Sequence, residues 1–425
     1  MKSGTLNIAF RLYEAGWRLA MPLLKIEPRL KDGYPARAFV QRPPGPADIW
    51  IQAASAGEAY LAVSLIKGLP PDRDLRVLVS TNTRQGLEIL AKAAADQSAQ
   101  ASRLSIALMF CPFDRPSVMD AAVRHIQPRV MVLLESELWP GLLYALKRYN
   151  RKTMIVNGRM TDRSLKRYRL LPGFCKALAP DKVLAMSPDD AGRFAALFGP
   201  DRVETMPSMK FDGVRVEGPE SQSALAIRNL LPKDSRFLVF GSIRQEEEPL
   251  VLDMIRLITG LLPGLVVGLF PRHMHRLDAW RQLLAKAGIK WVLRSALSAG
   301  PAGPDTVVLW DTFGELNAAY AEAAAVFVGG SLAPLGGQNF LEPLVHGVVP
   351  VIGPYWDNFT WVGEELFSAG LVRKTPDWQA AAAELVVLLE APPSRQTIRD
   401  QAAAFISQRQ GGTAQACRRI LEALD

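Results

Sequence analysis

The sequence of 425 residues contains few of the side chains on which disulfide and metal chemistry depend. Its three cysteines, Cys111, Cys175 and Cys417, are far apart, so they indicate neither a disulfide framework nor a metal knuckle, and they fit a reducing compartment. Of the four histidines only His273 and His275 are close together, and no cysteine or acid joins them at a metal-ligand spacing. The sequence therefore predicts a protein without a metal centre.

Several motifs of nucleotide and hydrolase chemistry are also missing. The chain has no Walker sequence, no dinucleotide fingerprint at its first strand and no Ser-His-Asp order. It lacks a basic stripe with interleaved aromatic residues, which argues against a nucleic-acid partner. Hydrophobic residues make up 49% and charged residues 22% of the chain, so large cores are expected and disorder is not. The net charge of +8 suits an anionic partner such as a nucleotide, a phosphorylated substrate or an acidic membrane surface.

No long uninterrupted apolar run is present. The most apolar stretch, residues 6–26, contains Arg11, Glu14 and Arg18, so it fits neither a spanning helix nor a signal peptide. At helical spacing these three residues share one stripe, and bulky apolar residues cover much of the remaining surface. The pattern favours a helix in the membrane interface, with basic residues towards anionic headgroups. An amphipathic helix packed on its own domain is the alternative.

What the chain does contain is a repeated alternation of short apolar runs with helical patterns, which predicts a doubly wound parallel α/β sheet. Six predicted strands lie in the first half, at 48–55, 75–81, 103–110, 129–136, 152–158 and 182–187. Six more lie in the second half, at 236–242, 265–271, 289–295, 306–312, 324–330 and 348–354. We therefore expect two Rossmann-like domains, with ligands bound at the carboxyl ends of both sheets in a shared cleft.

The segment 208–220 carries charges and a Gly-Pro pair without a long apolar period, and we interpret it as the domain connection. The expected parts are a membrane-interface segment at 1–30, an acceptor domain at 31–210, a donor domain at 211–400 and a C-terminal helix at 401–425. This C-terminal helix could cross back and pack on the N-terminal domain.

The first candidate site residue, Glu58, follows the first predicted strand. Ser55, Ala56 and Gly57 form a small, close turn, and Glu58 then opens a helix. A carboxylate at a helix N-terminus gains about 0.3–1 kcal/mol from the helix dipole, so capping alone would explain this acid. The other interpretation is a general base aimed at a substrate hydroxyl.

More charged residues follow later strands of the first half. Glu135 and Glu137 alternate along an extended chain and therefore point the same way. Like charges at close range raise one pKa, which is useful at a site, whereas two solvated loop acids are the simpler alternative. Arg159 comes directly after Gly158 at the end of the next strand.

The second half contains a glycine-rich stretch at 328–347, where five of twenty residues are Gly. It follows a predicted strand and precedes a predicted helix, so its bare amides and the helix dipole suit a phosphate group. Glu342, at the start of the helix, would accept hydrogen bonds from ribose hydroxyls. A tight strand-to-helix turn with a capping acid is the alternative.

Two further turns of the second half carry charge. Arg272 and His273 end a predicted strand, and the planar fork of Arg suits phosphate or carboxylate, although a surface salt bridge would also explain Arg272. The acids at 246–248 are most simply a solvated first helical turn.

Taken in order, these segments resemble the Kdo transferases, which transfer 3-deoxy-D-manno-octulosonic acid (Kdo) from CMP-Kdo to a lipid A precursor. The resemblance runs through most of the chain. The segments that carry it are AASAGE (53–58), ESELWP (135–140), VNGRMTDRS (156–164), MKFD (209–212), PRH (271–273), DTFGEL (311–316), VGGSL (328–332), GGQN (336–339), LEP (341–343) and GPYWDNF (353–359).

The resemblance implies a glycosyltransferase of the GT-B type that inverts the anomeric carbon and uses no metal or other cofactor. Glu58 would deprotonate the acceptor hydroxyl. Arg272, together with backbone amides near Ser331 and at 336–339, would hold the CMP phosphate. The residues that would orient the acceptor or the sugar are Ser55, Gly57, Glu135, Glu137 and Arg159. The residues that would bind the donor are Lys210, Ser242, Arg244, Arg272, His273, Gly314, Glu315, Ser331, Gly336, Gly337, Gln338, Asn339 and Glu342.

The partners implied are CMP-Kdo, a lipid A precursor of the lipid IVA type and the cytoplasmic face of the inner membrane, without nucleic acid. Two positions depart from the family: it usually has Ser-Thr-His where this chain has Ser242, Ile243 and Arg244, and His where this chain has Gln338. Arg244 preserves positive charge, and Gln338 can donate a hydrogen bond but cannot carry a proton. The alternatives are the same fold with another nucleotide-activated sugar, or a nucleotide-binding relative without catalysis.

Overall fold

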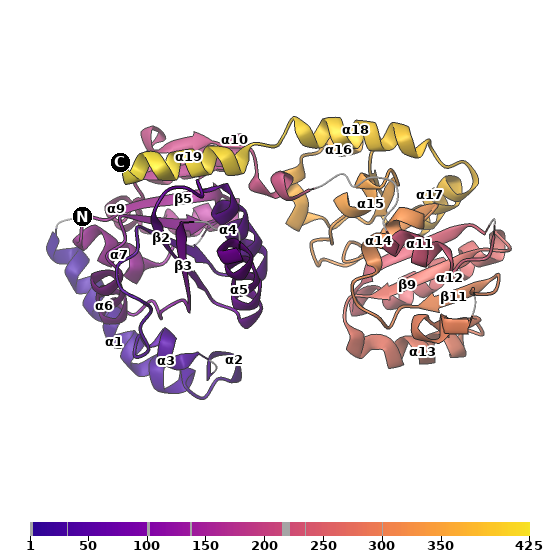
Figure 1. The fold of residues 1–425 in the computed structure, drawn as a ribbon, viewed down its shortest axis with the longest axis horizontal. Coiled ribbons are helices and arrows are strands. Elements are labelled where there is room, and N and C mark those ends of the chain that lie inside the picture. The colour runs from indigo at the N-terminus through magenta and orange to yellow at the C-terminus, as the bar shows by residue number, and fades with distance from the viewer. Residues whose placement is uncertain are drawn as a thin grey trace. The chain divides into compact units, whose positions relative to one another are not determined.

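The computed structural model describes residues 3–31, 33–99, 103–136, 138–214, 222–233, 235–299 and 301–425. Its chain divides into two compact units (Figure 1): unit 1 comprises the residues up to 213 together with 409–425, and unit 2 comprises 214–408. The sequence placed a separate C-terminal segment at 401–425. In the structure residues 401–408 belong to unit 2, and the chain re-enters unit 1 only at 409.

Unit 1 is built on a parallel sheet of seven strands in the order β3-β2-β1-β4-β5-β6-β7. The strand order reverses between β1 and β4, which is where doubly wound sheets bind ligands. The strands are β1 (Ile49–Ala53), β2 (Leu75–Thr81), β3 (Leu104–Phe110), β4 (Val130–Leu134), β5 (Lys152–Gly158), β6 (Lys182–Ala185) and β7 (Val203–Thr205).

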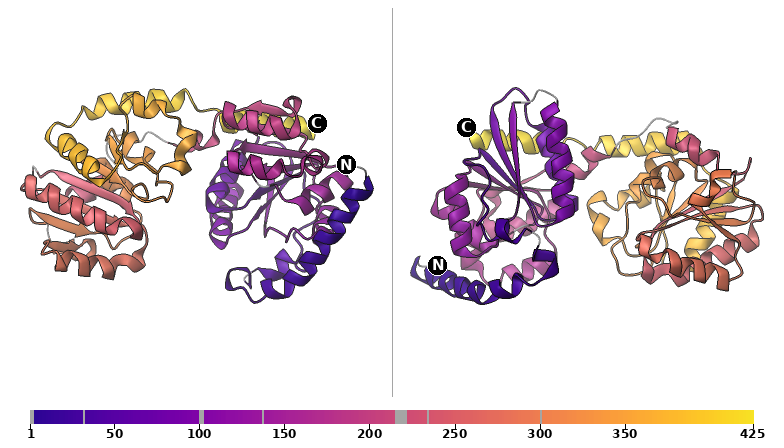
Figure 2. Two further views of the ribbon diagram at one scale, coloured as in Figure 1. Left: turned by 180° about the vertical axis from the view of Figure 1, so that it is seen from behind. Right: turned by 60° about the horizontal axis from the view of Figure 1, so that its bottom comes forward.

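Helices cover both faces of this sheet, as the two views in Figure 2 show. One core lies under α4, α5 and α19, and the other lies under α6, α7, α9 and α10. The helices of unit 1 are α1 (Ser3–Leu24), α2 (Pro28–Lys31), α3 (Tyr34–Arg37), α4 (Ala56–Gly68), α5 (Arg84–Ala99), α6 (Pro116–Ile126), α7 (Pro140–Arg148), α8 (Asp162–Tyr168), α9 (Pro172–Ala177), α10 (Pro188–Phe198) and α19 (Gly412–Leu424).

The C-terminal helix α19 completes the first of these cores. Cys417 and Ile420 are buried in it together with residues of β1 and α4. Asp212, at the end of unit 1's first segment, accepts hydrogen bonds from the amides of Gly411 (2.7 Å) and Thr413 (2.6 Å). These contacts tie the start of α19 to the point where the chain leaves unit 1.

Helix α1 packs along α6 and is anchored by aromatic and polar contacts (Figure 1). The ring of Phe10 stacks on that of Tyr144 at a centroid distance of 4.0 Å. The Tyr13 hydroxyl donates to the buried Asp114 (2.9 Å), whose carboxyl group also accepts from the amides of Gly141 and Leu142 at the start of α7. Burial raises the pKa of Asp114 to about 6, against the effect of these three donors. The helix is therefore packed on its own unit along one face.

Unit 2 has a second parallel sheet of seven strands, in the order β10-β11-β9-β8-β12-β13-β14. Its strands are β8 (Phe237–Ile243), β9 (Val266–Pro271), β10 (Trp291–Leu293), β11 (Thr306–Leu309), β12 (Ala325–Val328), β13 (Pro350–Ile352) and β14 (Arg373–Lys374). Its helices are α11 (Gln222–Arg228), α12 (Glu248–Leu261), α13 (Leu277–Lys286), α14 (Leu316–Glu322), α15 (Leu341–Val345), α16 (Glu365–Ser368), α17 (Trp378–Glu390) and α18 (Arg395–Ser407).

The two-unit parallel α/β architecture expected from the sequence is confirmed. The inner strands β1, β4, β8 and β12 are near-continuous apolar runs because helices bury them on both faces. The sequence missed β7 and β14, which have three and two residues and too little apolar periodicity to be recognised.

Candidate active site

In unit 1, Glu58 lies at the N-terminus of α4, directly after β1. Its carboxylate accepts hydrogen bonds from the Ala54 amide (2.7 Å) and the Ser55 hydroxyl (3.0 Å), while the Ser55 hydroxyl accepts from the Glu58 amide (3.2 Å). Ser55 therefore caps the helix, and these contacts fix the orientation of a Glu58 side chain that is only 9% exposed. Ser55 and Gly57 are themselves exposed. The capping contacts expected for Glu58 are present, and they hold the acid at the switch point of the sheet.

Glu135 follows β4, the neighbour of β1, and has a left-handed backbone with φ 56°. Its carboxylate forms an ion pair with the Lys210 ammonium group (Nζ to Oε1, 2.7 Å). Lys210 lies in a 3₁₀ helix, η2 (Met209–Gly213). The resemblance implied a donor-binding role for Lys210, but the structure pairs it with a unit 1 acid of the proposed acceptor set. Glu137 lies outside the described residues.

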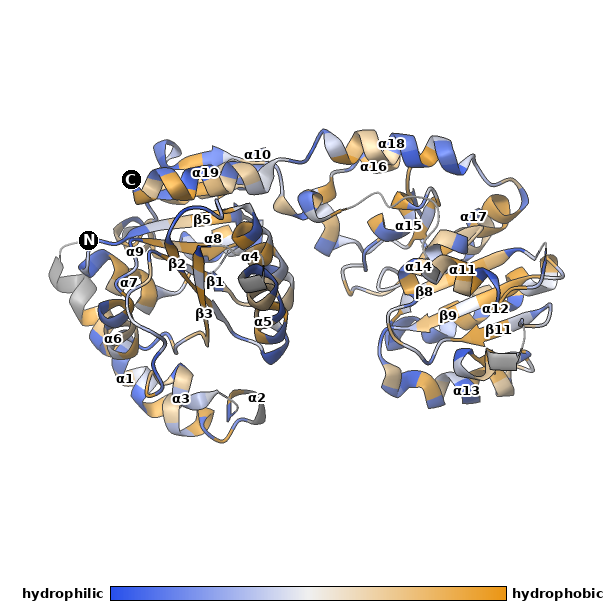
Figure 3. Cartoon of the chain, viewed as in Figure 1, coloured by the Kyte–Doolittle hydropathy of each residue, from blue (hydrophilic) through white to orange (hydrophobic). Residues whose placement is uncertain are grey.

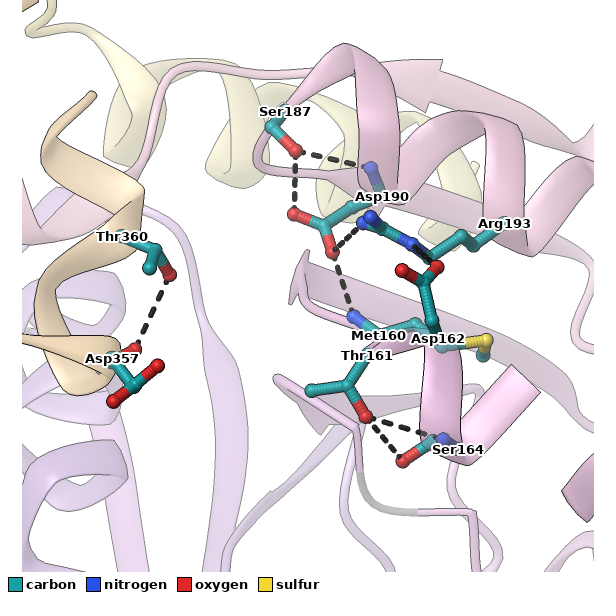
Figure 4. A network of polar contacts seen from close by, with 9 residues as sticks. All are labelled: Met160, Thr161, Asp162, Ser164, Ser187, Asp190, Arg193, Asp357 and Thr360. Atoms are coloured by element: carbon teal, nitrogen blue, oxygen red, sulfur yellow. Dashed lines mark hydrogen bonds and ion pairs between the residues drawn. The ribbon is translucent and has the colours of Figure 1, made fainter. Parts of the chain in front are cut away.

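Arg159 follows β5, in a loop that is held from two sides. Asn157, fully buried and left-handed at φ 56°, accepts from the Met209 amide (2.9 Å), so the end of β5 is tied to η2. On the other side Asp190 accepts from the Met160 amide (2.8 Å) and the Ser187 hydroxyl (2.6 Å), as Figure 4 shows. The carboxyl ends of β1, β4 and β5 thus present Glu58, Glu135 and Arg159 from adjacent, fixed turns.

In unit 2 the central feature is Glu247, which sequence analysis regarded as solvated. It is fully buried, in the short 3₁₀ helix η3 (Gln245–Glu247). Its carboxylate accepts from the backbone amides of four residues: Arg244 (3.2 Å), Gly330 (2.5 Å), Ser331 (2.8 Å) and Leu332 (2.7 Å). One side chain therefore joins the turn after β8 to the glycine-rich turn after β12.

This arrangement corrects two expectations. The acids at 246–248 are not a solvated turn, because Glu247 is buried and Glu248 is buried in an ion pair with Arg276 (2.6 Å). The amide of Ser331 does not face a phosphate, because Glu247 takes it together with its neighbours.

The second part of the glycine-rich stretch is also bonded internally. The Gly337 amide donates to the Gly330 carbonyl (2.7 Å) and the Gln338 amide to the Gly329 carbonyl (3.1 Å). Gly336 and Gly337 have φ of 82° and 81°, which permits this tight reversal. The expectation that these amides form a phosphate cradle is thus wrong for Gly337 and Gln338. No local signal in the sequence shows these internal hydrogen bonds.

Cations gather at the carboxyl ends of β8 and β9 instead. Arg272 and His273 are exposed there, and Arg244 lies in the turn after β8, beyond the left-handed Ser242 (φ 57°). Partial burial, followed by the positive charges of Arg244 and Arg272, lowers the pKa of His273. Among the described residues no carboxylate lies within ion-pair distance of Arg272. This cluster is the part of unit 2 best suited to hold an anion.

Glu342 lies at the second position of α15 and is held by Asn339, whose side-chain amide donates to it (3.0 Å). Burial raises the pKa of Glu342, while Asn339 and the charge of Arg272 oppose that rise. The positive charge of Arg272 acts on both His273 and Glu342. The three side chains therefore lie close enough to interact electrostatically.

Glu315 closes a separate loop after β11, next to the left-handed Gly314 (φ 84°). Its carboxylate accepts from Nε (3.0 Å) and Nη2 (2.8 Å) of Arg294, from Trp310 Nε1 (2.7 Å) and from Thr312 Oγ1 (2.7 Å). The acid therefore holds its own loop together, and this contact set gives no support for a direct donor contact.

Across the parts of the chain that the structure describes, no three His, Cys, Asp or Glu residues gather in a way that could hold a metal ion. No described helix meets the length and apolarity that crossing a membrane requires.

Two parallel seven-stranded sheets, each in its own unit with helices around it, define a protein of the GT-B fold. A glycosyltransferase from Rickettsia africae shares the fold at a TM-score of 0.58 and 11% identity, over 89% of this chain and 99% of that one. A UDP-N-acetylglucosamine 2-epimerase from Listeria monocytogenes shares it at 0.54 and 13% identity, over 90% of this chain and 96% of that one. At such identities the likeness concerns the fold alone.

Sequence relatives identify the family. Residues 29–213 match the family model of 3-deoxy-D-manno-octulosonic-acid transferases. The Kdo transferase of Bordetella pertussis is 31% identical, over 90% of this chain and 89% of the relative. That of Haemophilus influenzae is 27% identical, over 90% of this chain and 87% of the relative. The chain belongs to the Kdo transferase family.

Replacing Glu247 by Gln tests the role of the buried carboxylate. An amide cannot offer four accepting positions to four N–H donors, so we expect unit 2 to lose about 3 kcal/mol of stability. Differential scanning calorimetry of the whole chain measures this loss. The control is Glu246→Gln, an exposed neighbour, which should change stability by less than about 0.5 kcal/mol. Equal effects of the two variants would contradict the assignment.

Proposed function

We propose that this chain transfers Kdo from CMP-Kdo to a lipid A precursor of the lipid IVA type, in lipopolysaccharide synthesis, by an inverting reaction that needs no metal. The observation that carries the proposal is the placement of charged side chains at the switch points of both sheets, in a chain of the Kdo transferase family. Unit 1 presents carboxylates, as deprotonation of an acceptor hydroxyl requires. Unit 2 presents cations, which suit a phosphate leaving group.

In the proposed reaction the acceptor hydroxyl oxygen attacks the anomeric carbon of Kdo. The bond from that carbon to the phosphate oxygen breaks, CMP leaves with the electron pair, and the hydroxyl proton passes to Glu58. The capping contacts of Glu58 with Ala54 and Ser55 act as the orienting group that a general base needs. The charges of Arg244 and Arg272 stabilise the anion that forms on CMP.

Glu58→Gln tests this assignment. The variant preserves side-chain size and one acceptor for the cap, but it cannot take a proton, so we expect kcat to fall at least about 100-fold. The assay incubates the protein with CMP-Kdo and a tetraacylated lipid A precursor in the presence of EDTA and measures the product mass. CMP binding should be unchanged.

The matched control is Glu88→Gln, an exposed acid on α5 of the same unit. Full turnover by Glu58→Gln would overturn its role as the base. A wild-type protein that is active only without EDTA would contradict metal independence, and one that transfers another sugar but not Kdo would favour the alternative donor.

We further propose that α1 docks the enzyme on the cytoplasmic face of the inner membrane. Ile8, Leu12, Leu19 and Leu23 recur at spacings of four, seven and four, so they share one stripe of the helix. They are 61%, 70%, 80% and 70% exposed, respectively. The opposite face is packed on unit 1 through Phe10. Figure 3 shows hydrophobic and hydrophilic residues mixed along this helix. A row of exposed apolar residues with basic flanks suits the membrane interface.

Leu19→Glu tests the docking. The change removes apolar area from the stripe and adds a charge of the sign that anionic lipids repel, so we expect binding to vesicles containing phosphatidylglycerol to fall at least about tenfold. Co-sedimentation with vesicles measures it. Leu261→Glu, on an exposed position of α12, is the control and should bind like wild type. Equal binding by all three proteins would exclude α1 as the docking element.

A further inference from the structure

An open hollow of about 940 Å³ lies in unit 1 between α1 and the helices α6 and α7. It is distinct from the candidate active site, because α6 and α7 cover the face of the sheet opposite to α4, which carries Glu58. Its walls combine the aromatic rings of Phe10 and Tyr144 with an unusual number of arginines.

Four arginines line the hollow: Arg11 and Arg18 from α1, Arg124 from α6 and Arg148 from α7. Arg11 and Arg18 are seven residues apart and so lie on the same side of α1, next to the exposed apolar stripe. No ion pair or hydrogen bond joins Arg11 or Arg124 to another described residue, and both are exposed. Two guanidinium groups from different helices therefore face the hollow without a carboxylate partner.

The two acids that line the hollow are already bonded. Glu14 is held by Arg115 (2.6 Å), by Arg18 (3.2 Å) and by the amide of Ser117 (3.1 Å). Asp120 pairs with Arg148 (3.0 Å). Since Arg115, from outside the lining, satisfies Glu14, the hollow retains an excess of positive charge.

We propose that this hollow binds the phosphate headgroup of an anionic membrane phospholipid, with Arg11 and Arg124 as its principal ligands. The planar guanidinium group of Arg can donate two parallel hydrogen bonds to phosphate oxygens, whereas a diffuse positive surface gives no such directional contact. The exposed stripe of Ile8, Leu12 and Leu19 beside Arg11 would contact the acyl region of the same lipid layer, which a soluble phosphate ligand would not use. The proposal rests on the membrane docking of α1 proposed above.

The bound headgroup has a structural consequence. It would bridge α1 to α6 at the membrane surface and add to the contacts that already leave the stripe exposed. Docking would then depend on lipid charge at a defined site as well as on apolar area.

The experiment compares full-length variants on phosphatidylcholine vesicles with and without phosphatidylglycerol. Each basic group near an anionic surface contributes about fivefold, so we expect R11Q/R124Q to lose roughly thirtyfold in binding to anionic vesicles and little on neutral ones. R11K/R124K preserves the charge but not the fork, and we expect a loss of at least about threefold. The control K92Q/R418Q removes the same charge from exposed positions on α5 and α19 and should bind like wild type.

Each of the following results would contradict the proposed headgroup site. If R11K/R124K binds like wild type while R11Q/R124Q does not, the attraction is diffuse and no headgroup site exists. If the control loses as much as R11Q/R124Q, only net charge matters. If vesicle binding is unchanged but the KM for the lipid A precursor rises in neutral detergent, the hollow serves the acceptor instead. If wild type binds no vesicles, the membrane docking fails as well, although transfer in detergent would still stand.

Discussion

The buried carboxylate of Glu247 organises unit 2. By accepting four backbone amides from the turns after β8 and β12, it fixes both sides of the topological switch point with one side chain. A glycine-rich loop with free amides would attract a phosphate by itself. Here the carboxylate of Glu247 accepts from the loop amides at 330–332, so these amides are not available to a phosphate. In the proposed function the donor phosphate is then bound by the cations Arg244 and Arg272, which lie in the turns after β8 and β9.

Unit 1 uses the same principle on a smaller scale. Ser55 caps α4 and donates a hydrogen bond to Glu58, and the ion pair of Glu135 with Lys210 ties the end of β4 to η2. In both units an acid after a strand at the switch point is held by its surroundings. Such acids are positioned before any ligand arrives, which lowers the cost of ordering the site during the reaction.

The architecture was predictable from sequence because helices bury the strands of both sheets on each side, which leaves apolar runs such as 129–136 that alternate with helical patterns. The placement of Glu58, Glu135 and Arg159 after adjacent strands was predictable as well, because the carboxyl ends of parallel strands meet at one edge of a sheet. Hydrogen-bond partners were not predictable. Glu247 and the amide of Ser331 are 84 residues apart, and nothing local in the sequence shows that they meet. The two faces of α1 could not be separated either, because Phe10 and Leu12 are both apolar. Phe10 is buried because it packs on Tyr144 and Phe174, and Leu12 is exposed.

In the proposed function side-chain cations, and not loop amides, hold the donor phosphate. The most direct measurement is calorimetric titration of CMP into the Arg272→Gln variant, with Arg256→Gln on α12 as the control for lost positive charge. We expect the Kd of the Arg272 variant to rise at least about tenfold, since one charge-assisted contact to phosphate is lost, and that of the control to stay at the wild-type value. An unchanged Kd for Arg272→Gln would contradict the account.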